Sequence, residues 1–284
     1  MRIFNGKRAA NKILKELKEE IKKLKLSPTL GVIMVGKNEE SALYIKLKKQ
    51  TGAKIGIKVE EYIFGSDANE EEIIGKIQEL NKNEEISGII VQLPLPAVFN
   101  TDKIIETINP LKDVDGFHKQ NVALLEKGEP NFIPVLPQAI LLALTAAKTD
   151  LSDKKIVALV NSETFGRTLE IVFKNQGLKL HCWLRRACIV MGIEKEVKEA
   201  DVLILACGCP NFIKGDMIKE GAILIDAGIT RFHNNKVVGD VDRLSVEKKA
   251  AYLTPVPGGV GPLTVALLLR NVCLAAKLAS FNRA

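Results

Sequence analysis

Four groups of residues in this sequence have types and spacings that could carry out chemistry, and the first lies near the start of the chain. Ser41, Tyr44 and Lys48 stand at positions i, i+3 and i+7 of one predicted helix, so their side chains share a face. A lysine shielded from water holds its proton less tightly and can exchange protons near neutral pH. A solvated surface helix would also carry a tyrosine and a lysine, so the spacing alone leaves both interpretations open.

The second and third groups are a glutamine and a pair of aspartates. Gln92 closes the apolar run Ile86–Leu93, and ligands bind at the carboxyl ends of strands in open parallel sheets. Neighbouring backbone could equally satisfy this amide. Asp113 and Asp115 lie in a loop rich in turn-forming residues, which lacks the further oxygen ligands of a calcium site. A carboxylate here could also accept paired hydrogen bonds from a ligand that presents an amino group beside a ring N–H.

The fourth group is the loop Thr254–Pro262, which is rich in glycine and proline. Glycine lets backbone approach a ligand closely, and proline stiffens the loop. The N-terminus of the helix that follows can receive an anion or the polar edge of a ligand. A structural loop is the alternative, although this much glycine and proline is unusual for a plain connection.

A scaffold of alternating strands and helices must position these groups. In the first half, apolar spacing predicts helices over 7–26, 39–55 and 69–81 and strands over 30–35, 58–64 and 87–93. A turn-rich segment over 109–137 and an apolar helix over 137–148 follow. In the second half, the pattern predicts strands over 155–160, 179–183, 202–206 and 222–226 and a terminal helix over 262–280. Such alternation indicates parallel sheets with helices on both faces.

Composition excludes several classes of protein. The chain has 284 residues, of which 46% are hydrophobic and 26% charged, and this indicates an ordinary globular protein of about two domains. Its net charge is +7, but the lysines of the first helix alternate with glutamates and no aromatic residues are interleaved for base stacking. No signal-peptide core or membrane-spanning run is present. We therefore expect a soluble, cytoplasmic protein that binds neither nucleic acid nor membrane.

The number and spacing of the cysteines also indicate the kind of protein. Their number is odd and they lack paired CxxC spacing, whereas a disulfide framework or a zinc site requires an even, spaced set. We expect buried free thiols in a reducing compartment, and no metal site. The cysteines are Cys182, Cys188, Cys207, Cys209 and Cys273.

Seven blocks of the sequence resemble the bifunctional methylenetetrahydrofolate dehydrogenase/cyclohydrolase family, in its order and from about residue 3 to residue 280. The blocks are Ser41-x-x-Tyr44-x-x-x-Lys48, Val91–Pro96, Lys112–Phe117, Phe212–Met217, Ile225–Ile229, Val238–Asp242 and Pro257–Pro262. The resemblance implies two reactions. Methylenetetrahydrofolate is oxidised to methenyltetrahydrofolate with a nicotinamide cofactor, and water then converts the methenyl compound to formyltetrahydrofolate.

The resemblance also implies roles for individual residues. Lys48 would be the key catalytic residue, with Tyr44 packing or hydrogen-bonding beside it. Gln92 would hold and tune Lys48, and Asp115 would anchor the pterin head group. These four residues are the predicted catalytic set. The predicted substrate contacts are Tyr44, Lys48, Val91, Gln92, Leu93, Asp115, Pro257, Gly258 and Gly259.

The departures from the family lie in the second half. Where the family has Gly-Arg-Ser and then Val-Gly, this chain keeps only Ser162 and Gly166, and a G-x-G-x-x-G fingerprint is absent. We predict NADP as cofactor, with NAD as the alternative, because arginines rather than a carboxylate follow the second strand. The predicted cofactor contacts are Val160, Asn161, Ser162, Gly166, Arg185, Arg186 and Ile229. A cyclohydrolase-only enzyme and a non-catalytic folate-binding subunit are the alternative functions.

Pattern and resemblance together predict a two-domain α/β fold. Residues 1–118 would form the folate-binding catalytic domain, to which the terminal helix at 262–284 returns. Residues 119–149 would form a connecting segment and a crossing helix. Residues 150–261 would form a Rossmann-like, doubly wound NAD(P)-binding domain. The resemblance further implies a homodimer built through this last domain.

Overall fold

A computed structural model describes residues 1–36, 39–185, 188–232 and 237–281, except for the side chains of residues 39 and 40. The chain forms two compact units, which we name after their larger sheets. The three-strand unit comprises residues 11–135 and 265–284. The six-strand unit comprises residues 1–10 and 136–264.

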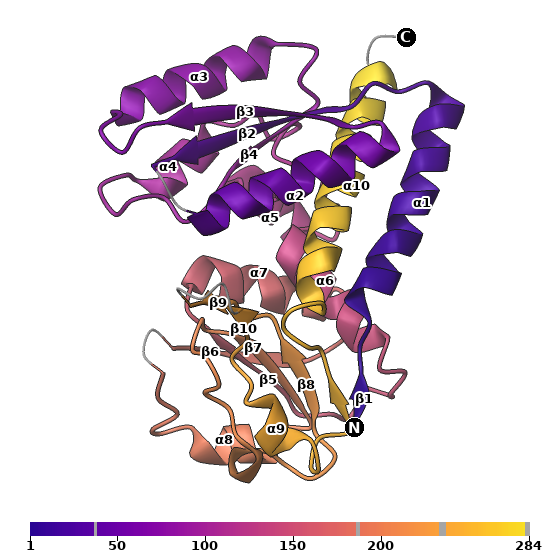
Figure 1. Ribbon diagram of the computed structural model, residues 1–284, viewed down its shortest axis with the longest axis vertical. Coiled ribbons are helices and arrows are strands. Elements are labelled where there is room, and N and C mark those ends of the chain that lie inside the picture. The colour runs from indigo at the N-terminus through magenta and orange to yellow at the C-terminus, as the bar shows by residue number, and fades with distance from the viewer. Residues whose placement is uncertain (37–38, 186–187, 233–236, 282–284) are drawn as a thin grey trace. The chain divides into compact units, whose positions relative to one another are not determined.

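The three-strand unit is built on a parallel sheet with strand order β3-β2-β4. Figure 1 shows helices α2 and α3 on opposite faces of this sheet. Every residue of the central strand β2 is buried, as expected for a parallel strand covered on both faces. The elements are α1 (Gly6–Leu24), β2 (Thr29–Val35), α2 (Glu39–Ile55), β3 (Lys58–Phe64), α3 (Glu70–Lys82), β4 (Gly88–Val91), α4 (Thr101–Glu106), α5 (Lys119–Glu126) and α10 (Val260–Phe281).

One face of this sheet packs against α3. Ile73, Ile77 and Leu80 fall at helical spacing and are buried against Ile33 of β2 and Val91 of β4. This apolar layer holds β4 in the sheet as far as Val91, and the residue that follows β4 is Gln92. The sheet therefore sets the position of one candidate site residue directly.

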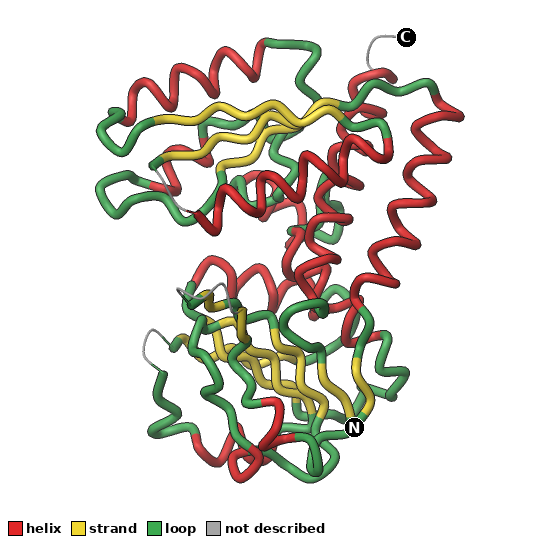
Figure 2. Tube along the Cα trace, in the orientation of Figure 1, coloured by secondary structure: helices red, strands yellow, loops and turns green. Residues whose placement is uncertain are grey.

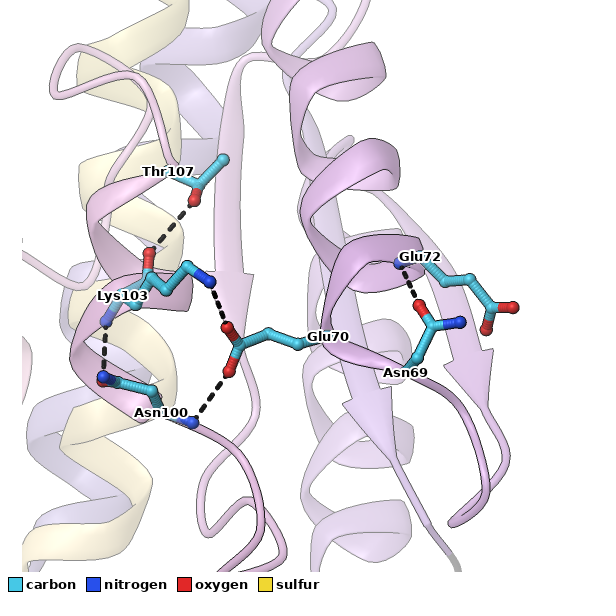
Figure 3. Close-up of polar contacts among 6 residues, drawn as sticks. All are labelled: Asn69, Glu70, Glu72, Asn100, Lys103 and Thr107. Atoms are coloured by element: carbon cyan, nitrogen blue, oxygen red, sulfur yellow. Dashed lines mark hydrogen bonds and ion pairs between the residues drawn. The ribbon is translucent and has the colours of Figure 1, made fainter.

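Polar caps fix the starts of α3 and α4, as Figure 3 shows. Asn69 accepts a hydrogen bond from the backbone N–H of Glu72, and Asn100 accepts one from that of Lys103. Glu70 joins the two helix starts, because its carboxylate accepts from the Asn100 N–H at 3.0 Å and from Lys103 Nζ at 2.6 Å. The caps define where the two helices begin, and the Glu70–Lys103 ion pair adds little stability because water screens it.

The six-strand unit is built on a sheet with strand order β1-β11-β8-β7-β5-β6, and every described pairing in it is parallel. Figure 2 shows long loops after several of its strands. The elements are β1 (Arg2–Ile3), α6 (Val135–Thr145), β5 (Ile156–Val160), α7 (Glu163–Lys174), β6 (Leu180–Leu184), α8 (Glu194–Glu199), β7 (Val202–Ala206), η1 (Gly215–Met217), β8 (Ile223–Asp226), β9 (Thr230–Arg231), β10 (Val237–Val238), α9 (Arg243–Val246) and β11 (Tyr252–Leu253).

The predicted fold class is confirmed, with two parallel sheets and alternating helices. The turn-rich segment 109–137 contains one helix that the sequence pattern does not predict, α5, which is short and half polar. The compact units also differ from the predicted domain boundaries. Residues 1–10 belong to the six-strand unit because β1 pairs with β11, and nearly all of α6 belongs there too. From Val265 onward, α10 belongs to the three-strand unit.

The expectation of five free thiols is wrong for one pair. Cys188 and Cys209 form a disulfide that links the loop after β6 to the loop after β7. Their separation of 21 residues gave no sequence signal, because only the fold brings the two loops together. Cys182, Cys207 and Cys273 are free.

Candidate active site

Lys48 is the centre of a polar cluster in the three-strand unit. It lies on α2, one helical turn after Tyr44, and its side chain is half-buried. Its Nζ donates a hydrogen bond of 2.6 Å to Oε1 of Gln92. The structure thus brings together a lysine and a glutamine that stand 44 positions apart, as predicted.

Gln92 is held at both ends. Its backbone N–H continues the sheet by donating to the carbonyl of Ile33 at 2.7 Å, and its Nε2 donates to the carbonyl of Leu93 at 2.9 Å. With the amide nitrogen used in this way, the amide oxygen faces Lys48. Val91 is buried at the end of β4, whereas Leu93 is exposed.

The two aspartates of the 112–118 loop have different surroundings. The buried carboxylate of Asp113 accepts hydrogen bonds from the backbone N–H groups of Gly116 and His118 and from Nδ2 of Asn121. Among the described residues, none donates a hydrogen bond to the carboxylate of Asp115. Asp113 therefore organises the loop, and Asp115 is the carboxylate left for a ligand.

Electrostatics couple Lys48 to Asp115. Burial lowers the pKa of Lys48 to about 8, and the negative charge of Asp115 partly offsets this by raising it. Burial raises the pKa of Asp115 to about 6, which the positive charge of Lys48 opposes and the charge of Asp113 reinforces. Near neutral pH the carboxylate is thus mostly ionised, and a small fraction of the lysine is an uncharged amine. This arrangement can exchange protons and bind a cationic or N–H-rich ligand.

The glycine- and proline-rich loop belongs to the six-strand unit. Its Pro257 is exposed, and Gly258 has a φ of 102°, a left-handed conformation that favours glycine. The Gly258 carbonyl accepts a hydrogen bond of 3.0 Å from the backbone N–H of Gly6. Gly259 is buried, and a side chain there would collide with the carbonyl of Pro255 at 2.5 Å. The contact of Pro257, Gly258 and Gly259 with substrate stays a prediction.

The loop after β5 lies at the carboxyl edge of the six-stranded sheet. Ser162 caps α7 by accepting from the backbone N–H of Phe165, and the exposed Asn161 donates from Nδ2 to the carbonyl of Cys207. Gly166 lets α7 pack closely on the sheet, because a Cβ there would lie 3.1 Å from Val160. These residues shape the edge where a dinucleotide binds in such folds.

Arg185 follows β6 at the same edge. Its guanidinium lies 5.5 Å from the ring centroid of Trp183, and its Nη1 donates to the carbonyl of Leu184. Its Nε is buried and has no hydrogen-bond partner among the described residues. Ile229 is exposed after β8, and Arg186 lies outside the described residues. A guanidinium can give a phosphate paired hydrogen bonds, and the contact of Arg185 with a cofactor phosphate stays a prediction.

Two buried carboxylates at this edge were not predicted as organisers of the loops. Asp240 accepts from the backbone N–H groups of Cys207, Gly208 and Cys209. Asp226 accepts from those of Gly228, Asp240 and Val241. Burial raises the pKa of Asp226 to about 7. The sequence signal was present in the Ile-Asp-Ala-Gly and Gly-Asp-Val-Asp blocks, but it did not show what the carboxylates bind.

In the described part of the chain, no group of three or more His, Cys, Asp or Glu side chains could hold a metal ion. Among the described helices, α10 is long and apolar enough to cross a membrane, but 56% of its most apolar stretch is buried inside the structure. A buried core helix can have the same length and composition, so this helix is weak evidence for a membrane span.

Comparisons with known proteins match the chain over nearly its whole length. The family described as "Tetrahydrofolate dehydrogenase/cyclohydrolase, catalytic domain" matches residues 4–115, and its "NAD(P)-binding domain" matches residues 134–280. "Bifunctional protein FolD" of Acetivibrio thermocellus is 41% identical over 281 residues, which cover 98% of this chain and 97% of that protein.

Solved structures agree with this match. The bifunctional FolD enzyme of Campylobacter jejuni is 38% identical, with a TM-score of 0.90 and full coverage of both chains. The methylenetetrahydrofolate dehydrogenase–cyclohydrolase of Trypanosoma brucei, solved with NADP and an inhibitor, is 30% identical with a TM-score of 0.92. That alignment covers 100% of this chain and 99% of the other.

Proposed function

The chain belongs to the tetrahydrofolate dehydrogenase/cyclohydrolase family, and from this premise we propose that it carries out both reactions at the Lys48 cluster. It oxidises methylenetetrahydrofolate to methenyltetrahydrofolate with NADP, and it hydrolyses the product to formyltetrahydrofolate. The observation that carries this proposal is the Lys48–Gln92 hydrogen bond beside an aspartate that is left for a ligand. A cyclohydrolase-only enzyme and a non-catalytic subunit are not favoured, because both family domains match.

The oxidation creates a positive charge. Hydride leaves the methylene bridge and the product is a methenyl cation, and NADP is the group that accepts the hydride when bound. An uncompensated ammonium group beside this cation would oppose its formation. The lowered pKa of Lys48 makes an uncharged amine accessible, and the Asp115 carboxylate compensates the charge when the amine is protonated.

The hydrolysis requires proton transfers that Lys48 can perform. Water attacks the amidinium carbon while the uncharged amine takes one of its protons, which gives a neutral hydroxylated intermediate. The ammonium then protonates the ring nitrogen as its bond to that carbon breaks. The amine recovers the hydroxyl proton as the formyl group forms. One proton is released to solvent in the net reaction, and Gln92 holds the amine in place throughout.

Asp115 and its neighbours would bind the substrate. Its ionised carboxylate can accept two hydrogen bonds, from the amino group and the ring N–H of the pterin. Tyr44 on the same face of α2 and the flanking residues Val91 and Leu93 would line the folate. Contact of Pro257, Gly258 and Gly259 with the substrate remains a prediction from the family resemblance. In this assignment the three-strand unit is the catalytic domain and the six-strand unit holds the cofactor.

For the cofactor, Arg185 would grip the extra phosphate of NADP. No carboxylate stands at the end of β6 to select the bare ribose of NAD, and the guanidinium has a free buried Nε among the described contacts. Arg185→Ala should weaken NADP binding about tenfold and leave NAD binding nearly unchanged, as measured by calorimetric titration. An unchanged NADP/NAD ratio would remove Arg185 from this role without touching the assignment of the two reactions.

Purified protein tests the two reactions separately. We expect methenyltetrahydrofolate to form from methylenetetrahydrofolate only with the nucleotide, and added methenyltetrahydrofolate to disappear without it. Loss of the first reaction with the second intact would indicate a cyclohydrolase-only enzyme. We propose further that the protein is a cytoplasmic homodimer that supplies formyl groups for purine synthesis. Sedimentation at micromolar concentration checks the dimer.

A further inference from the structure

A buried asparagine in the terminal helix lies directly behind the Asp115 loop. Asn271 is 3% exposed on α10, and no block of the family resemblance includes it. We infer that Asn271 is a positioning residue that orients Asp115 toward the pterin. This inference rests on the proposed function, because it takes Asp115 as the pterin anchor.

The amide of Asn271 joins two separate segments of backbone. Its Nδ2 donates to the carbonyl of Val114 at 2.9 Å and to the carbonyl of Ile133 at 3.2 Å. An amide nitrogen carries two hydrogens, so both are used. The Val114 carbonyl belongs to the peptide group that leads into Asp115, and its hydrogen bond therefore fixes the plane from which the Asp115 side chain departs.

The two joined segments also hold each other. The backbone N–H of Val135 donates to the carbonyl of Asp115 at 3.3 Å. Gly116 has a φ of 84°, and a Cβ there would approach Pro134 Cα to 3.1 Å. The peptides on both sides of Asp115 are thus tied to residues 133–135, and Asn271 is the one side chain among the described residues that bonds to both segments.

Asp113 cannot replace this support. Its carboxylate binds the N–H groups of Gly116 and His118, which lie after Asp115 in the chain. Asn271 holds the peptide before Asp115. Removing the amide leaves the buried Val114 carbonyl and the half-buried Ile133 carbonyl without this donor. Rotation of the Val114–Asp115 peptide can then restore a hydrogen bond to the Val114 carbonyl. The Asp115 carboxylate would turn away from its productive direction, which weakens substrate binding.

The test is a double-mutant cycle on the full-length enzyme. Asn271→Leu keeps the side-chain volume and removes both donors, and we expect the KM for methenyltetrahydrofolate to rise about tenfold with kcat changed less than threefold. In an Asp115→Ala background the same substitution should raise KM less than twofold further, because Asn271 acts through Asp115. The Kd for NADP should not change in any of these variants.

Controls separate positioning from simple loss of stability. Val272→Ala removes volume at the next buried position of α10 without touching either carbonyl, so it should lower Tm and leave KM unchanged. If the leucine variant does not fold, Asn271→Ser replaces it, since serine keeps one donor on a shorter side chain. Its KM should rise when Asp115 is present and change little in the Asp115→Ala background.

The outcomes are distinguishable. Unchanged KM in a folded Asn271 variant, or equal increases in the presence and absence of Asp115, overturns the positioning role. A rise of the same size in Val272→Ala would also overturn it, since stability alone would then explain the effect. If Asp115→Ala itself leaves KM unchanged, the proposed anchoring by Asp115 fails, and the inference about Asn271 fails with it.

Discussion

The polar groups around Lys48 and those at the carboxyl edge of the six-stranded sheet are used in opposite ways. Around Lys48, the amide oxygen of Gln92 accepts a hydrogen bond from the lysine, and no described residue donates a hydrogen bond to the Asp115 carboxylate. At the carboxyl edge of the larger sheet, most polar groups bind the protein itself. Asp226 and Asp240 each accept three backbone N–H groups, and Asn161 donates to a loop carbonyl.

This difference shows that a position at the ligand-binding edge of a sheet does not by itself make a polar residue a ligand contact. In the first region, the Asp115 carboxylate is left for a ligand, and the pKa values of Lys48 and Asp115 are strongly shifted. The second region is a set of loops joined by hydrogen bonds, in which the Nε of Arg185 is buried without a hydrogen-bond partner among the described residues. Substitutions should therefore change the reaction in the first region, and cofactor affinity or stability in the second.

The largest effect is expected from Lys48→Met. Methionine keeps much of the length of the side chain but cannot accept or donate a proton, so both activities should fall about 100-fold or more while folding survives. Steady-state rates of oxidation and of methenyl hydrolysis, with circular dichroism as the check on folding, measure this. Lys49→Met is the matched control, because Lys49 is exposed on the same helix and pairs with Glu61. Near-normal hydrolysis in Lys48→Met would remove Lys48 from the mechanism.

A second comparison separates the two aspartates of one loop. Asp115→Ala should raise the KM for folate about tenfold or more with little change in Tm, since it leaves the pterin donors unpaired. Asp113→Ala should instead lower the free energy of unfolding by about 1–3 kcal/mol, since it strips the acceptor from two backbone N–H groups and Asn121. Thermal melts and steady-state kinetics on both variants decide. A reversed pattern would mean that Asp113 contacts the substrate.

Much of this arrangement could be predicted from the sequence, and the reason is periodicity. Strands such as Val202–Ala206 are continuous apolar runs because helices cover both faces, so their bounds can be read directly. Lys48 and Gln92 could be paired only through the family resemblance. Asp115 could likewise be singled out from Asp113 only through the resemblance, because the residue types alone do not show which carboxylate binds the protein's own backbone. The disulfide and the contacts of Asn271 could not be predicted because the partners are distant in sequence. Asn271, for example, bonds to a residue 157 positions away.

A smaller effect is expected on the pH dependence of hydrolysis. At saturating substrate the rate should rise with pH toward a plateau above the Lys48 pKa of about 8, because the uncharged amine is the reactive form. The charge of Asp115 raises that pKa, so Asp115→Asn should lower it and move the midpoint to lower pH. Glu61→Gln changes an exposed charge near the same helix and should leave the midpoint in place. A midpoint that moves upward in Asp115→Asn would contradict the coupling.

The smallest effect on the reactions should come from the disulfide of the six-strand unit. Cys188–Cys209 closes a loop of about 21 residues, which in the chain-entropy account contributes about 3 kcal/mol to the free energy of unfolding. Cys209 is already fixed, because Asp240 accepts its backbone N–H at 2.6 Å, whereas Cys188 is exposed. Reduction by a dithiol should therefore release Cys188 and leave the Asp240 contacts intact. We expect dithiothreitol to lower the Tm of the wild type and to change the Kd for NADP no more than a few-fold, with methenyl hydrolysis unaffected. Cys188→Ser should have the lower Tm already and should not respond to the reductant. A Tm that responds equally in the two proteins would show that the bond does not hold these loops, and a fall in hydrolysis would show that the disulfide also affects the reaction at Lys48.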